Sequence, residues 1–149
     1  HHLRSAMLDS CAVVEEALTG FLAENHPKPP AKNAPTGQKV ERAKEVKANA
    51  KRSKAIKKQT DEALALWGAL LAKRADIVHS RMSIAVTMEG QFIALFRNAK
   101  NGGHSYAQSL VLSEREFEDY VNELRSAGNQ LVAALNATNP PPLQKAKAA

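Results

Sequence analysis

Basic residues are concentrated in one segment of this 149-residue chain, and that segment has few bulky side chains to bury. Residues 28–58 contain eleven Lys and Arg but only two acidic residues, Glu41 and Glu45, which gives a net charge of +9. Because the formal total is +6, the rest of the chain carries −3. The pattern predicts a mildly acidic folded body that bears a basic segment.

The basic segment belongs to a longer stretch of good helix formers. Ala, Lys, Glu, Arg and Gln dominate from about residue 38 to about residue 81, which predicts one long helix. Its first half, 38–60, has almost no bulky apolar residue, so we expect it to project or to dock on a partner. Its second half carries Leu64, Trp67 and Leu71 on one stripe and belongs to the core.

A second helix is predicted at the start of the chain. Its apolar residues recur at steps of three and four and form one stripe: Leu3, Met7, Cys11, Val14, Leu18, Phe21 and Leu22. Residues 1–6 are interpreted as a tag remnant and 7–25 as the native helix. His26-Pro27 ends this helix, and the four prolines of residues 26–37 predict an extended linker.

Residues 83–97 fit two structures. As a hairpin around Glu89-Gly90, they would pair Val86 with Ile93 and Ile84 with Leu95. As a helix, they would form an apolar stripe that ends near residue 101. The β-branched residues and the internal glycine favour the hairpin.

The rest of the chain completes the predicted fold. Residues 105–112 predict a third strand, and Ser113-x-x-Glu116 matches a capping box. The helix that it opens has six inward apolar residues: Phe117, Tyr120, Val121, Leu124, Leu131 and Leu135. We therefore predict a helix-dominated α+β fold with a small antiparallel sheet, the alternative being an all-α bundle with one long helix. Residues 38–135 would form a single domain with 7–25, and 136–149 a disordered tail.

The sequence lacks the sets of residues that catalysis and metal binding most often require. One cysteine and a few scattered histidines supply no zinc set, and no phosphate-binding or nucleophile motif is present. We therefore expect no enzyme, cofactor, metal or small-molecule substrate, and no apolar run suggests a membrane span. The single Cys11 is expected to be a buried, inert thiol. It suits an intracellular, cytoplasmic location, with the nucleus or an organelle left open.

The basic segment supplies the candidate binding residues. On one helix, Lys44, Lys47, Lys51, Lys54 and Lys58 would form a stripe about 21 Å long. Five neutralised phosphates would give a salt slope of about −4.5 on duplex DNA. The absence of interleaved aromatic residues predicts contacts to the backbone rather than to bases. The full predicted set is Lys39, Arg42, Lys44, Lys47, Lys51, Arg52, Lys54, Lys57 and Lys58.

Two functions follow from these patterns. The first is a nucleic-acid-binding or ribonucleoprotein-associated protein, for RNA or DNA, that uses the basic segment. The alternative is a helical scaffold protein that self-associates, as a homo-oligomer, or docks an acidic protein partner through its apolar helices. A helical seam needs apolar residues at regular positions, and residues 38–60 offer only Val40, Val46 and Ile56.

Overall fold

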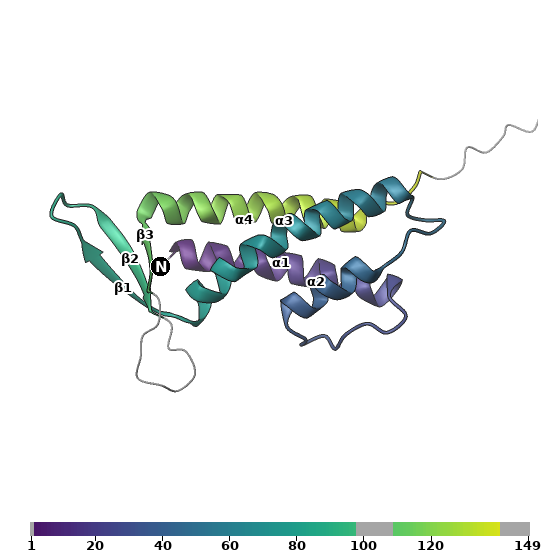
Figure 1. Cartoon of the computed structure of the whole chain (residues 1–149), viewed down its shortest axis with the longest axis horizontal. Helices are drawn as coiled ribbons and strands as arrows, with labels where there is room; N and C mark the ends of the chain where they lie inside the picture. Colours follow the sequence, from purple (N-terminus) through teal and green to yellow (C-terminus); the bar gives the residue numbers. More distant parts are fainter. Residues whose placement is uncertain (1, 98–108, 141–149) are drawn as a thin grey trace, which may run out of the picture.

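The computed structural model describes residues 2–97 and 109–140 and confirms a helix-dominated α+β fold (Figure 1). Within these ranges, four helices accompany one three-stranded antiparallel sheet. In chain order the elements are α1 (His2–Asn25), α2 (Thr36–Glu45), α3 (Lys54–His79), β1 (Arg81–Val86), β2 (Phe92–Arg97), β3 (Ser109–Ser113) and α4 (Glu114–Asn136).

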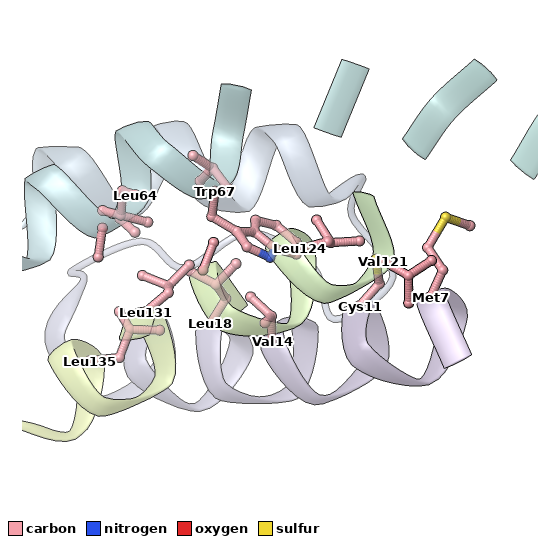
Figure 2. Close-up of a cluster of buried hydrophobic side chains, with 14 of the residues drawn as sticks. Met7, Cys11, Val14, Leu18, Leu64, Trp67, Val121, Leu124, Leu131 and Leu135 are labelled. Atoms are coloured by element: carbon pink, nitrogen blue, oxygen red, sulfur yellow. The ribbon is translucent and has the colours of Figure 1, made fainter. Parts of the chain in front are cut away.

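The helices form an elongated body in which α4 packs against both α1 and α3, while α2 packs beside α1 and α3. Figure 2 shows the Trp67 indole of α3 lying between Val14 of α1 and Leu124 of α4. The predicted stripes of α1 and α4 are confirmed as core. Cys11 is 2% exposed, and burial raises the pKa of its thiol.

One glycine allows the helices to approach closely. A Cβ atom placed on Gly128 of α4 would lie 2.9 Å from Val14 Cγ2 and 3.5 Å from Trp67 Nε1. Real Cβ atoms do not come that close to a neighbouring carbon, so a larger residue would push α4 away from α1 and Trp67.

The hairpin prediction for residues 83–97 is confirmed, but its register was wrong by one residue. Val86 pairs with Phe92 and Ile84 with Ala94, because the turn is centred on Glu89. Gly90, at a φ of 82°, donates its N–H to the Thr87 carbonyl and closes a three-residue loop. Three side chains of each strand therefore share one face: Met82, Ile84, Val86, Phe92, Ala94 and Phe96.

The sheet is attached to the body at one end and projects from it (Figure 1). Phe96 is fully buried, and its ring meets the Phe117 ring of α4 edge-on at 5.5 Å. The predicted capping box is confirmed, since Ser113 and Glu116 hydrogen-bond each other's backbone N–H at the start of α4. The hydrogen bonds from Ser113 lower the pKa of Glu116. Positions 105–108 of the predicted third strand lie outside the described residues.

Candidate interaction surfaces

The predicted long basic helix is interrupted. α2 ends at Glu45 and α3 begins at Lys54, so residues 46–53 form a connecting loop. Val46 takes an extended conformation and is buried, which turns the chain away from the axis of α2. Ser53 then caps α3 by accepting a hydrogen bond from the Ile56 N–H. Lys44 and Lys58 therefore lie on different helices, and the predicted continuous stripe of lysines is wrong.

Two of the nine predicted binding residues are buried. Lys39 is 5% exposed, and its Nζ donates to the Lys32 carbonyl at 2.7 Å. Arg52 is 4% exposed and lies where α4 ends. Neither charge is presented at the surface as a phosphate-binding side chain would be.

The Arg52 guanidinium is the C-terminal cap of α4. Nη1 donates to the carbonyls of Leu135 and Ala137 at 2.6 and 2.9 Å. Nη2 donates to the Ala134 carbonyl and the Thr60 hydroxyl, at 3.0 and 2.7 Å. The group also stacks over the Phe21 ring, and burial lowers its pKa. A cation here adds donors to carbonyls at the end of α4, where the helix itself supplies few, and complements the negative end of the helix dipole.

Four further predicted residues form ion pairs. Arg42 meets Glu45 at 3.0 Å, and Lys44 meets Glu41 at 2.6 Å. On α3, Lys57 meets Asp61 at 2.6 Å and Lys58 approaches Glu62 at 3.8 Å. Arg42, followed by His26, lowers the pKa of Glu45. Because each cation has a nearby carboxylate, these residues present less free positive charge than their number suggests.

Three predicted residues are exposed, and their side chains have no hydrogen-bond or ion-pair partner in the part of the chain that the structure describes: Lys47, Lys51 and Lys54. They lie on the 46–53 loop and at the first residue of α3. If each neutralised one phosphate, the salt slope would be about −2.7 rather than −4.5. Lys51 also lines a cavity of about 650 Å³ between the loop and the ends of α1 and α4.

The 46–53 loop is held by a segment that the sequence assigned to a disordered tail. Asn139 donates its backbone N–H to the Lys51 carbonyl and its Nδ2 to the Ala50 carbonyl, both at 2.7 Å. Its Oδ1 accepts the Ser53 N–H at 3.1 Å. Asn139, within the predicted disordered tail, is therefore docked on the loop, and 141–149 lie outside the described residues.

Sequence reasoning missed an apolar surface on the projecting sheet. Ile84 is 60% exposed, while Val86 and its cross-strand partner Phe92 are each 58% exposed, all on one face. Met88 in the turn is fully exposed beside them. We call these four residues the sheet-tip surface. Alternation predicts that Ile84 and Val86 share one apolar face of the hairpin, and no sequence signal indicates that the helices stop short of them.

An apolar cavity borders the sheet-tip surface. It has a volume of about 170 Å³ and lies where the starts of α1 and α4 meet the same face of the sheet. Leu3, Met82, Ile84 and Phe117 are among the residues that line it. The exposed face is therefore continuous with a recess beneath the helix ends.

The fold and surfaces define a helix-dominated α+β protein with a projecting, partly uncovered sheet. No described helix is long and apolar enough to cross a membrane. Within residues 2–97 and 109–140, no group of three or more His, Cys, Asp or Glu side chains is placed to hold a metal ion. No family model, no curated protein and no solved structure matches the chain.

Proposed function

We propose that this chain is a non-enzymatic interaction protein that self-associates through the sheet-tip surface. The supporting observation is the shared exposure of Ile84, Val86 and Phe92 on one face of a hairpin that extends beyond the helices. Exposed apolar area costs free energy in water, and a contiguous patch recovers that cost when a partner covers it.

A second copy is the partner that this surface fits best. All four of its residues are apolar and uncharged, so it offers no basic group to an acidic partner. Two identical apolar patches can meet each other about a two-fold axis, which is the usual geometry of homodimers. The apolar stripes of α1 and α4, by contrast, are buried in the core of the chain, so they are not available to pack against the helices of a second copy.

Sedimentation velocity over a wide concentration range tests the proposal. We expect a monomer–dimer equilibrium that Phe92→Glu shifts strongly toward monomer. Val13→Glu is the matched control, because Val13 is 56% exposed on α1, outside the sheet-tip surface. A protein that stays monomeric at every concentration, or equal weakening by both variants, would contradict self-association through the sheet.

A second candidate function is backbone-directed binding of nucleic acid by Lys47, Lys51 and Lys54. Its support is that these three lysines are exposed and free of carboxylate partners in the described chain. Labelled RNA and DNA would be titrated against the chain at several salt concentrations. Reversing the three lysines to Glu should abolish the salt-dependent binding, whereas reversing Arg97, Arg115 and Arg125 should not. Equal loss in both variants would show binding by net charge alone.

A further inference from the structure

The strand β1 forms one edge of the sheet, since the strand order is β1-β2-β3. It pairs with β2 through six consecutive residues, and no other described strand pairs along its outer side. Half of the backbone groups of an edge strand point away from the sheet, so β1 has a row of N–H and C=O groups available for another strand.

β1 lacks the features that usually protect an edge. Its sequence, RMSIAV, contains no proline and no lysine, and its one-to-one pairing with β2 leaves no bulge. Arg81, at its first position, is its only charged residue. Proteins that must stay monomeric usually place a charge, a proline or a bulge near the middle of such a strand.

The side chains of β1 are also self-complementary. In an antiparallel pair, residues directly opposite each other point to the same face. A two-fold axis at Ile84 places Ile84 opposite its own copy and Met82 opposite Val86 of the partner subunit. All three apolar residues of that face then meet apolar residues, and the two Arg81 side chains lie at opposite ends. An axis at Ser83 would instead leave Val86 opposite Ser80.

This arrangement also places Val86, near the exposed tip of each hairpin, beside the covered base of the other sheet. Antiparallel pairing brings the tip of one sheet beside the base of the other, where helix ends cover the same face. Val86 of the partner subunit would lie next to Met82, which lines the 170 Å³ cavity beneath the starts of α1 and α4. Exposed Val86 of each copy therefore lies near the apolar cavity of the other copy.

From these observations we infer that two copies join edge to edge through β1, antiparallel and centred on Ile84, to form one six-stranded sheet. The inference rests on the proposed self-association and specifies its geometry. Edge pairing holds the two Ile84 Cα atoms about 4.5–5.5 Å apart, within reach of a disulfide. Stacking the sheets face to face would keep the backbones about 10 Å apart, which a disulfide cannot span.

Oxidative cross-linking of single-cysteine variants tests this geometry. Ile84→Cys should form a disulfide-linked dimer in high yield. Val86→Cys is the matched control, since Val86 is equally exposed but would lie about 14 Å from its own copy, four residues out of register. A mixture of Met82→Cys and Val86→Cys should cross-link as a heterodimer. The unaltered chain, whose Cys11 is buried, should give none.

The outcomes separate the geometry from the self-association itself. Cross-linking of Ile84→Cys at least about tenfold above Val86→Cys supports pairing centred on Ile84. A chain that dimerises by sedimentation but cross-links only through Ser83→Cys, Val86→Cys or Val111→Cys, or through none of these variants, overturns that pairing and leaves self-association intact. A chain that is monomeric by sedimentation overturns both. Backbone amides of β1 should also exchange more slowly as concentration rises, which face-to-face stacking would not cause.

Discussion

Where α4 ends, the protein buries a cation, and where the sheet projects, it exposes apolar side chains. Arg52 at the first end is 4% exposed and donates four hydrogen bonds, three to carbonyls at or just after the end of α4 and one to Thr60 of α3. Ile84 at the other end is 60% exposed and lies on β1, whose outer side pairs with no other described strand. Figure 1 places these two regions at opposite ends of the molecule.

The contrast shows that residue type alone does not determine which side chains of this protein are buried and stabilise the fold. Buried Arg52 stabilises the fold because the last carbonyls of α4 need hydrogen-bond donors from outside the helix. Ile84 and Phe92 are exposed because the four described helices leave the tip of the sheet largely uncovered. The basic end is therefore a structural joint, and the apolar end is the surface available to a partner.

The largest expected effect tests the structural joint. Arg52→Ala removes four hydrogen bonds and leaves the carbonyls of Ala134, Leu135 and Ala137 without this donor. We expect the free energy of unfolding to fall by about 3 kcal/mol in urea titrations, since hydrogen bonds from a charged group are strong and buried acceptors are costly to leave unpaired. Lys51→Ala, next in sequence but exposed, should change it by no more than about 0.5 kcal/mol. Equal effects would mean that Arg52 is not a cap.

A smaller effect tests how tightly the helical body is packed. Gly128→Ala gains about 1 kcal/mol of helix propensity but forces a Cβ to within 2.9 Å of Val14 Cγ2. Overpacking a core typically costs about 1–3 kcal/mol, so we expect net destabilisation of about 1 kcal/mol. Gly20→Ala in α1 has open space around it and should instead stabilise the fold by about 0.5–1 kcal/mol. A stabilising Gly128→Ala would show that α1 and α4 can separate at little cost.

The α1 and α4 stripes and the capping box were predictable because they depend on neighbours within one helix. Val14 and Leu18, or Ser113 and Glu116, are brought together by helical spacing itself. The hairpin was predictable from its glycine and β-branched residues, but its register depended on which three residues form the loop. A shift by one residue changes the partner of every side chain, as Ile84 and Ala94 show.

The binding residues were less predictable because their roles depend on distant segments. Arg52 acts on carbonyls more than eighty residues away, and Asn139 anchors a loop that lies far from it in sequence. Local composition made residues 38–60 appear to be one helix, whereas the burial of Val46 and the cap at Ser53 divide it. The sheet-tip surface was missed because alternation shows which face is apolar, not whether anything covers it.

We expect the capping box at the start of α4 to make stability depend on pH. Hydrogen bonds from Ser113 hold the pKa of Glu116 below its unfolded value. Such a group stabilises the fold above the unfolded pKa, and that contribution is lost as pH falls through the folded pKa. We would measure the free energy of unfolding of the unaltered chain and of Glu116→Gln in urea at pH 6 and at pH 3. The unaltered chain should be more stable at pH 6, and this difference should be smaller at pH 3. Glu118→Gln, which lies outside the capping box, should show no such change. A constant difference for Glu116→Gln would contradict the ionised capping box.

The smallest expected effect is at the sheet tip. Ile84→Thr keeps a β-branched residue on the strand and removes an apolar group that is already 60% exposed. At concentrations where the chain is monomeric, we expect the free energy of unfolding to change by no more than about 0.5 kcal/mol. At high concentration the same variant should weaken dimerisation, because the proposed dimer places Ile84 of one β1 strand against Ile84 of the other. A loss of more than about 1.5 kcal/mol in the monomer would mean that the tip is covered within one chain, which would remove the contrast between the two ends.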